Sequence, residues 1–295
     1  MLEIMLPAVA AAVILVGIHA YLGVHILARG VIFVDLALAQ IAALGAITGV
    51  LFGLQMHTTG SYLASLAATF VGAGVFALTR GKKTTGAMQE AAIGIVYVVS
   101  AALAVMVLDR LPGEAEHLKG MLVGNILFVT WPQVLKTAVL YAAVGLAHYA
   151  FRERFLAISF CQDQACQPGL RLWDFLFYAL FGVVVTSSVE LAGVLLVFAF
   201  LIIPAVSAAH FAASLKARLW LGWALGVVTA LSGIALSAGY DLPTGPAIVC
   251  AFGALALISS AAGRLLWPEG GGWRPLALKT SAPPLKNMRN SAGNA

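Results

Sequence analysis

Long apolar runs, separated by short polar segments, dominate the chain up to about residue 265. A helix needs roughly 20 apolar residues to cross the hydrocarbon core of a bilayer. Nine runs approach this length and are the candidate spans: residues 5–27, 31–53, 60–79, 91–108, 134–150, 173–189, 191–213, 219–239 and 244–265. The sequence lacks the alternating segments, each of about 10 residues, that are typical of a transmembrane β-barrel. The pattern therefore predicts an all-α polytopic membrane protein with eight or nine transmembrane helices.

Composition supports this prediction and divides the chain into two parts. Hydrophobic residues make up 61% of the chain and charged residues 10%, with a mean hydropathy of +0.97, whereas an average soluble domain is about 25% charged. We therefore expect residues 1–265 to form one transmembrane domain. Residues 266–295 are rich in Gly, Pro and Asn with scattered cations, so we expect a disordered cytoplasmic tail. The first apolar run lacks a basic flank and is long enough to be a span, so we expect no cleavable signal peptide.

The distribution of positive charge predicts the topology. When alternate loops are assigned to the two faces, all but three of the 17 Lys and Arg residues fall on one face; the exceptions are Arg110, Lys119 and Lys136. The positive-inside rule then places the N-terminus outside and the C-terminus in the cytoplasm. Both flanks of residues 173–213 belong to the cytoplasm, so this segment must cross the membrane an even number of times. Two short helices joined near Ser187–Gly193 satisfy this condition, and a re-entrant pair is the alternative.

Polar side chains interrupt the first two predicted spans: His19, His25, Asp35 and Gln40. An ionisable group in a membrane helix usually faces a partner or a cavity. Asp35 has two interpretations, an ion pair with Arg29 at the cytoplasmic interface or a role in a translocation pathway. His19 and His25 are six residues apart and point about 120° away from each other on a helix, so they cannot chelate one ion together. Each is either a hydrogen-bonded buried histidine or a separate ligand.

A second group of residues is typical of helices that pack closely and move. Gly45, Gly49 and Gly53 recur every four residues in the second span, a spacing that lets helix backbones approach each other. This stripe fits packing inside one subunit, or a helix beside a translocation path or dimer seam. Glu190 and Pro204 interrupt an otherwise strongly apolar stretch. We therefore assign both to the pathway or its gating, with Glu190 near the outer end.

Motifs for catalysis and nucleotide binding are absent from the sequence. The nearest match to a phosphate-binding GxxxxGK[ST] loop is RGKKT at residues 80–84, which has Phe76 where the first glycine should be. The sequence contains no HExxH and no GxSxG, and nothing assembles a nucleophile, a base and oxyanion donors. We therefore expect a transport subunit that has no cofactor and is not an enzyme.

Four segments together resemble the permeases of bacterial ABC importers for zinc, manganese or iron. The resemblance covers about residues 10–265, and its segments occur in the order GVHILARGVIFVDLALAQIAALG, EAAIGIVYVVSAALAVMVL, KGMLVGNILFVT and GVLLVFAFLIIPAVSAAH. The last segment is the most specific, because it is similar to the family's Gly-x-Leu-Leu-Val…Leu-Ile-x-Pro-Ala signature. The resemblance implies a permease in the bacterial plasma (inner) membrane, with zinc as the expected cargo and manganese or iron as alternatives.

The resemblance also implies partner proteins. It predicts cytoplasmic ABC ATPase subunits that hydrolyse ATP, an extracytoplasmic metal-binding protein and a second permease copy, expected here as a homodimer. In the family, the loop that matches residues 155–172 carries the coupling helix that contacts the ATPase. The residues that fall in this part of the chain are Asp163, Gln164, Ala165 and Gly169.

The chain departs from the family along the expected metal path. The family's second helix typically reads Phe-x-Gly-Asp-Ala-Leu-Ser-His-Ala. Aligned on the phenylalanine, its aspartate falls on Leu36 and its histidine on Gln40, while Asp35 takes the preceding glycine position. We therefore expect a shifted path for the transported metal, formed by Asp35, Gln40, His19 and His25.

Two other functions stay open on the sequence alone. One is an ion-coupled secondary transporter of a small solute, in which Asp35, Glu90 and Glu190 carry the coupling ion. Glu90 also has a simpler interpretation, because a carboxylate is stabilised at the N-terminus of its own helix by the helix dipole. The other function is a membrane scaffold or sensor that transports nothing. A secondary transporter would need no ATPase, and an ionophore would abolish its uptake even in the presence of ATP.

Overall fold

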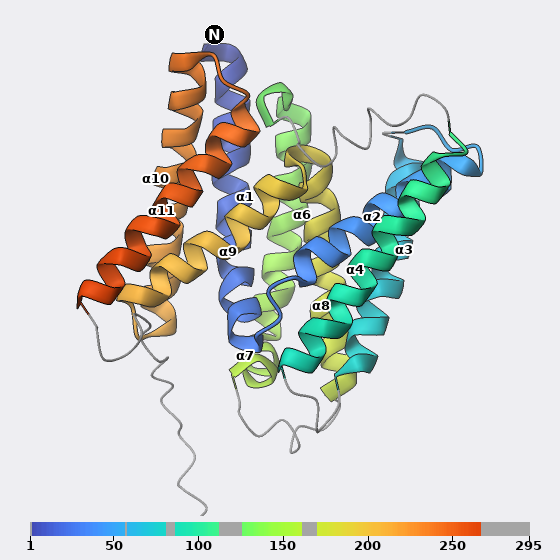
Figure 1. Ribbon diagram of the computed structural model, residues 1–295, viewed down its shortest axis with the longest axis horizontal. Coiled ribbons are helices and arrows are strands. Elements are labelled where there is room, and N and C mark those ends of the chain that lie inside the picture. The colour runs from blue at the N-terminus through green and yellow to red at the C-terminus, as the bar shows by residue number, and fades with distance from the viewer. Residues whose placement is uncertain (1, 57, 81–85, 112–125, 161–169, 267–295) are drawn as a thin grey trace, which may run out of the picture.

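The computed structural model describes residues 2–56, 58–80, 86–111, 126–160 and 170–266, and every regular element in these ranges is helical (Figure 1). The elements are α1 (Leu2–Arg29), α2 (Val34–Leu51), α3 (Thr59–Thr79), α4 (Gly86–Leu108), the short 3-10 helix η1 (Ile126–Phe128), α6 (Trp131–Ala150), α7 (Arg152–Phe160), α8 (Leu170–Ala192), α9 (Val194–Phe211), α10 (Leu215–Tyr240) and α11 (Thr244–Leu266). The prediction of an all-α fold is confirmed for this part of the chain.

The number of spans also agrees with the prediction. Eight helices are long and apolar enough to cross a membrane, and a ninth span results if α6 and α7, which are bent by 76° relative to each other, are counted as one. Large apolar side chains face outward on α4 and α11, for example Ile95 (65% exposed) and Leu257 (75% exposed). A surface of this kind is stable when lipid rather than water surrounds it. The orientation of the two termini stays a prediction from charge.

Residues 173–213, for which the sequence left two alternatives, lie in two consecutive helices, α8 and α9, each long and apolar enough to cross a membrane. The break falls at Gly193, whose φ of 79° lies in the left-handed region that glycine adopts without steric cost. The amide of Gly193 still donates to the carbonyl of Val189 at 2.9 Å, and its own carbonyl accepts from Val197 at 3.1 Å. The chain therefore changes direction here without leaving these backbone groups unpaired.

Two short helices, α2 and α9, form the centre of the bundle. Each has 18 residues, of which 72% are buried. Each also follows a longer helix after a glycine with positive φ, Gly30 at 67° and Gly193 at 79°. α2 packs against α3, α4 and α8, whereas α9 packs against α10, α11 and α1. In Figure 1, α1 descends from the N-terminus toward α7, and α8 runs back in the opposite direction. The helices α1–α4 and α8–α11 thus repeat one packing pattern with opposite chain direction, an arrangement common in transporters.

Three of the arginines that the topology prediction assigned to the cytoplasm are buried in the protein. Arg29 is 7% exposed, Arg80 3% and Arg218 8%. Arg218 donates from Nε to the carbonyl of Ala212 at 2.9 Å, beside the start of α10. These cations lie at helix ends on the predicted cytoplasmic side, but their side chains bind protein groups rather than facing water. These three arginines therefore count toward the excess of positive charge on the predicted cytoplasmic face, but they also stabilise the packing of the helices.

Close packing of α1 on α9 depends on Gly23, and this gives a test of the fold. A Cβ at Gly23 would collide with the backbone carbonyl of Leu201, so Gly23→Ala must push the two helices apart. We expect thermal unfolding in detergent to show a loss of about 1–3 kcal/mol, the usual cost of overpacking. Gly17→Ala, on the same helix with no atom within 4 Å of the added Cβ, is the matched control. Equal melting temperatures for the two variants would contradict this packing.

Candidate functional site

The two histidines of α1 belong to separate networks, as their spacing predicts. His19 is fully buried; its Nδ1 lies 2.7 Å from the carbonyl of Leu15 and its Nε2 lies 3.1 Å from the hydroxyl of Ser188 on α8. Ser188 also hydrogen-bonds with the hydroxyl of Tyr141 on α6. His25 instead has its Nδ1 2.9 Å from the Ser159 hydroxyl on α7. Both imidazoles therefore connect α1 to other helices through hydrogen bonds.

Asp35, in the first turn of α2, has no polar partner within the described part of the chain. Its side chain is fully buried, and neither carboxylate oxygen has a hydrogen-bond partner there. Of the two interpretations of Asp35, the ion pair with Arg29 is wrong, because Arg29 binds Asp174 of α8 instead, at 3.0 Å. A buried carboxylate without a partner is costly, so such a group inside a membrane helix points to an ion or proton pathway.

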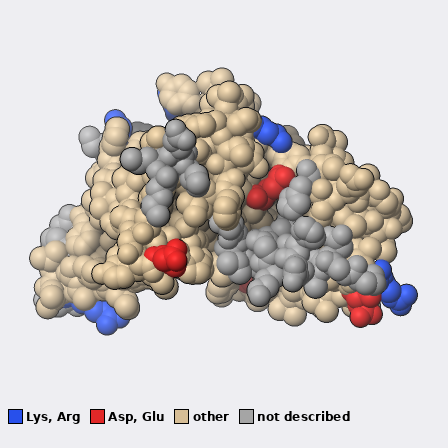
Figure 2. Space-filling model, turned by 90° about the horizontal axis from the view of Figure 1, so that it is seen from above, with Lys and Arg blue, Asp and Glu red and all other residues tan. Residues whose placement is uncertain are grey.

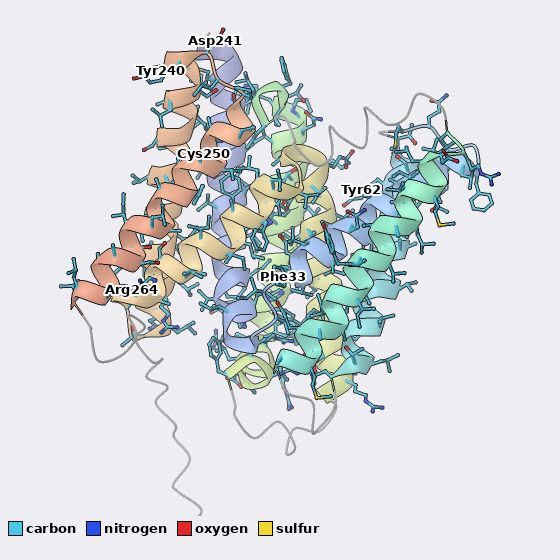
Figure 3. All side chains as sticks on the ribbon, in the orientation of Figure 1. Phe33, Tyr62, Tyr240, Asp241, Cys250 and Arg264 are labelled. Carbon is cyan, nitrogen blue, oxygen red and sulfur yellow. The ribbon has the colours of Figure 1, made fainter. Side chains whose placement is uncertain are left out.

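The position of α2 explains why Asp35 is deep in the bundle. After α1 ends, the chain turns back into the protein before α2 begins, and Figure 3 shows Phe33 above the level of the α7 end of the molecule. The backbone amide of Phe33 donates to Oε1 of Glu90 on α4 at 3.0 Å. Glu90 therefore caps the N-terminus of α2, not the start of its own helix as the simpler interpretation proposed. A side chain from the neighbouring helix α4 thus accepts a hydrogen bond from one of the backbone amides that are left unpaired at the N-terminus of α2.

The other end of α2 lines a small cavity next to Glu190. The cavity has a volume of about 30 Å³, which is enough for one or two water molecules. Its polar groups come from three hydroxyl-bearing residues of α3 and from one hydroxyl and one carboxylate of α8, and Figure 3 shows Tyr62 in the upper part of the bundle. The lining residues are Ala42, Ala46, Met56, Ser61, Tyr62, Ser65, Thr186, Val189 and Glu190. Glu190 is therefore the acidic group of this cavity.

Gln40 lies on α2 between Asp35 and the cavity. Its side chain is 7% exposed, and it precedes the cavity-lining Ala42 by about half a turn of the helix and Ala46 by about one and two-thirds turns. One helix thus carries the buried carboxylate, the amide and one wall of the cavity. The polar groups named here therefore follow α2 from Asp35 in the interior to the cavity next to Glu190.

The glycine stripe on α2 packs inside the subunit. Cβ atoms built on Gly45 and Gly49 would crowd Ala64 on α3, so these two positions allow α2 and α3 to approach closely. Gly53 lies beyond the end of α2 and has a φ of 89°, which makes it a turn residue and not a third member of the stripe. Pro204 is buried within α9, and its atoms lie against Gly226 of α10. These contacts place both features at helix–helix packing surfaces.

A buried charge network at the opposite end was not predicted from the sequence. One oxygen of Asp174, in the first turns of α8, accepts from Nη1 of Arg29 at 3.0 Å and from Nη1 of Arg80 at 2.5 Å. Arg29 also donates from Nε to the Ser159 hydroxyl at 3.0 Å, and Arg80 donates from Nη2 to the Ile158 carbonyl at 2.8 Å. The network therefore ties the ends of α1 and α3 to α7 and α8.

This network contacts the first part of the predicted coupling segment, residues 155–172, and the residues just after it. Ser159 is at the end of α7 and Asp174 is near the start of α8, whereas the predicted coupling residues Asp163, Gln164, Ala165 and Gly169 fall outside the described residues. The sequence did contain a signal for the network, because Asp174 is an ionisable residue inside the predicted span 173–189. Its two partners, at positions 29 and 80, could not be found by helical spacing.

No preassembled metal centre is present in the ranges that the structure describes. No group of three or more His, Cys, Asp or Glu side chains is placed to hold one ion. The predicted path residues Asp35, Gln40, His19 and His25 therefore do not converge on one point. Figure 2 shows the upper face of the molecule, where acidic side chains of the described residues form a few separate patches.

Comparison with known sequences gives matches over most of the chain. The model of the ABC 3 transport family matches residues 1–263. A probable iron transport system membrane protein of Haemophilus influenzae is 26% identical, over 88% of this chain and 93% of its own length. The membrane protein of a high-affinity zinc uptake system from the same species is 25% identical over 88% and 97%. A manganese transport system membrane protein of Halalkalibacterium halodurans is 26% identical over 81% and 80%.

Solved structures show the same fold. PsaBC from Streptococcus pneumoniae, in complex with a Fab, superimposes with a TM-score of 0.71 at 22% identity, covering 87% of this chain and 90% of that chain. An inward-facing putative metal-chelate type ABC transporter superimposes with a TM-score of 0.65 at 17% identity, covering 88% and 84%. The helical arrangement described above is therefore that of ABC transporter permeases.

The charge network predicts a large effect for a small substitution. Asp174→Asn keeps the shape of the side chain but leaves two buried guanidinium groups without a counter-charge. Breaking a buried ion pair from one side costs about 3–5 kcal/mol, so we expect markedly earlier thermal unfolding in detergent and a lower yield of monodisperse protein. Asp109→Asn, an exposed carboxylate just after α4, is the control and should behave like the wild type. Wild-type unfolding of Asp174→Asn would contradict the structural role of the network.

Proposed function

Because the chain belongs to the ABC 3 transport family, we propose that it is the membrane permease through which an ATP-driven importer passes a divalent transition-metal ion, with zinc as the first candidate. The match of the family model to residues 1–263 carries this proposal. Relatives named for iron, zinc and manganese transport support the class of cargo, and manganese and iron are the alternatives to zinc.

In the proposed path, α2 guides the ion. The cation enters next to Glu190, passes the small polar cavity between α2, α3 and α8, and meets Asp35 deeper in the bundle. Support comes from the cavity lining and from the two carboxylate oxygens of Asp35, which have no hydrogen-bond partner among the described residues. A divalent ion would offset the cost of a buried, unpartnered carboxylate, and a single carboxylate would release it again readily. His19 and His25, which hydrogen-bond to other helices, would act on the path only by holding α1 in place.

Energy would come from separate ATPase subunits. The sequence has no phosphate-binding loop of its own. The proposed coupling segment 155–172 includes most of α7 and runs into the start of α8. The Arg29–Asp174–Arg80 network ties both of these helices to the bundle. A displacement of the segment by the ATPase would therefore reach α1, α3 and α8 directly. An extracytoplasmic binding protein would deliver the ion, and a second permease copy would complete the pathway.

Metal content of cells tests the cargo and the role of Asp35 together. A strain that lacks this gene is grown under chelator limitation, complemented with the wild type or with Asp35→Asn, and measured by elemental mass spectrometry. We expect the wild type to restore one of zinc, manganese or iron. Asp35→Asn should reduce initial uptake roughly tenfold, equivalent to about 1.4 kcal/mol of lost cation stabilisation.

The control for this experiment is Asp109→Asn, which changes an exposed carboxylate and should restore uptake fully. Full uptake by Asp35→Asn would contradict the path along α2 while leaving the permease assignment intact. No change in any metal on loss of the gene would contradict the cargo class. Uptake that stops with a protonophore while ATP is maintained would favour an ion-coupled secondary transporter instead.

Coupling is tested on the reconstituted importer. We expect Asp163→Ala and Gly169→Pro to leave the assembly with the ATPase subunits intact but to lower both uptake and the ATPase stimulation by the loaded binding protein severalfold. The reason is that a proline and a lost carboxylate alter the surface through which the ATPase would move the permease. Unchanged uptake and stimulation in both variants would show that the contact lies elsewhere.

A further inference from the structure

A groove with apolar walls lies between α1, α6 and α10, away from the proposed ion path. Its volume is about 650 Å³, within the range of about 300–1,000 Å³ that holds a small-molecule ligand. Ile14, Ile18, Ala142, Leu219 and Trp223 contribute to its walls. Two polar groups of the wall are already engaged inside the protein, since Trp223 donates from Nε1 to the Gly17 carbonyl at 2.8 Å and the Tyr21 hydroxyl lies 3.2 Å from His148 Nδ1. The groove therefore offers mainly hydrocarbon and aromatic surface.

Two cations line the same groove at one end. Arg152 is the first residue of α7 and Lys216 is the second residue of α10; both are exposed. Neither forms an ion pair with any described residue, because the described ion pairs both involve Asp174. The Arg152 guanidinium lies 4.8 Å from the ring centroid of Tyr149, which also lines the groove. No acidic side chain is among the described lining residues. Within the described part of the chain, this end of the groove is thus positively charged and has no acidic counter-charge.

From this combination we infer that the groove binds an anionic phospholipid, with an acyl chain along α1, α6 and α10 and the phosphate between Arg152 and Lys216. Long basic side chains at helix ends extend toward the headgroup region, and basic pockets between transmembrane helices on the cytoplasmic side bind anionic headgroups. The topology predicted from charge places this end in the cytoplasmic leaflet, where the lipid would contact both α7 and α10. A zwitterionic lipid would fill the apolar part but would leave the two cations without a counter-charge.

Native mass spectrometry of the purified full-length protein tests this inference. The protein is mixed with detergent micelles containing phosphatidylglycerol or phosphatidylcholine, and bound lipid is measured as a function of concentration. We expect the wild type to bind phosphatidylglycerol roughly tenfold more tightly than phosphatidylcholine. The double variant Arg152→Ala/Lys216→Ala should lose this preference. Arg171→Ala/Arg264→Ala, which removes two exposed cations that do not line the groove, should retain it; Figure 3 shows Arg264 at the lower end of α11.

A second variant tests the apolar part separately. Gly145 lines the groove, and a Cβ added there has no atom within 4 Å, so Gly145→Leu fills the hollow without displacing a helix. We expect it to weaken binding of both lipids while the protein stays folded and monodisperse. Equal binding of the two lipids by the wild type would overturn the inference. So would an unchanged preference in the Arg152→Ala/Lys216→Ala protein, equal competition by inorganic phosphate, or a second copy of the chain covering the groove in the purified dimer.

Discussion

A single buried carboxylate holds one end of this bundle together. Asp174 accepts from two arginines that lie at positions 29 and 80, and those arginines also bind α7. The guanidinium of Arg29 lies 3.8 Å from the ring centroid of Phe177, so the charge is further stabilised by an aromatic face. In a bundle whose outer surface faces lipid, no water would replace a lost partner. The relative positions of α1, α3, α7 and α8 therefore depend on this network.

The central helices depend on a different constraint, the reversal of the chain inside the bundle. Gly30 and Gly193 adopt positive φ and let α1 and α8 each lead into a short buried helix. Because α2 begins inside the protein, its first-turn amides need an acceptor there, and Glu90 provides one to Phe33. The same reversal buries Asp35. A helix that started at the membrane surface would have exposed this carboxylate to water and headgroups, and it would not need a partner.

Much of this architecture could be predicted from the sequence, because the length of each span can be read from local composition alone. The basic residues Arg171 and Lys216 on either side of residues 173–213 likewise predicted two helices with a break near Ser187–Gly193. The partner of Arg29 could not be predicted, since the pairing with Asp174 joins residues 145 positions apart and helical periodicity contains no information about such contacts. The ion-pair interpretation of Asp35 failed for a related reason. Its sequence distance from Arg29 suggested a pair, but the chain reverses at Gly30, and Arg29 binds Asp174 instead.

The two aspartates, Asp174 and Asp35, show how charge is divided between structure and the proposed transport. Asp174 has two cationic partners in a region next to the proposed coupling segment, where a rigid connection would transmit movement. Asp35 has no partner in the described chain, at the start of the helix that leads to the cavity with Glu190. A fixed partner at Asp35 would compete with a passing cation, and additional ligands would hold that cation too long. An isolated carboxylate on a buried helix is therefore compatible with weak, reversible binding, and the cost of burying it would fall whenever a cation is present.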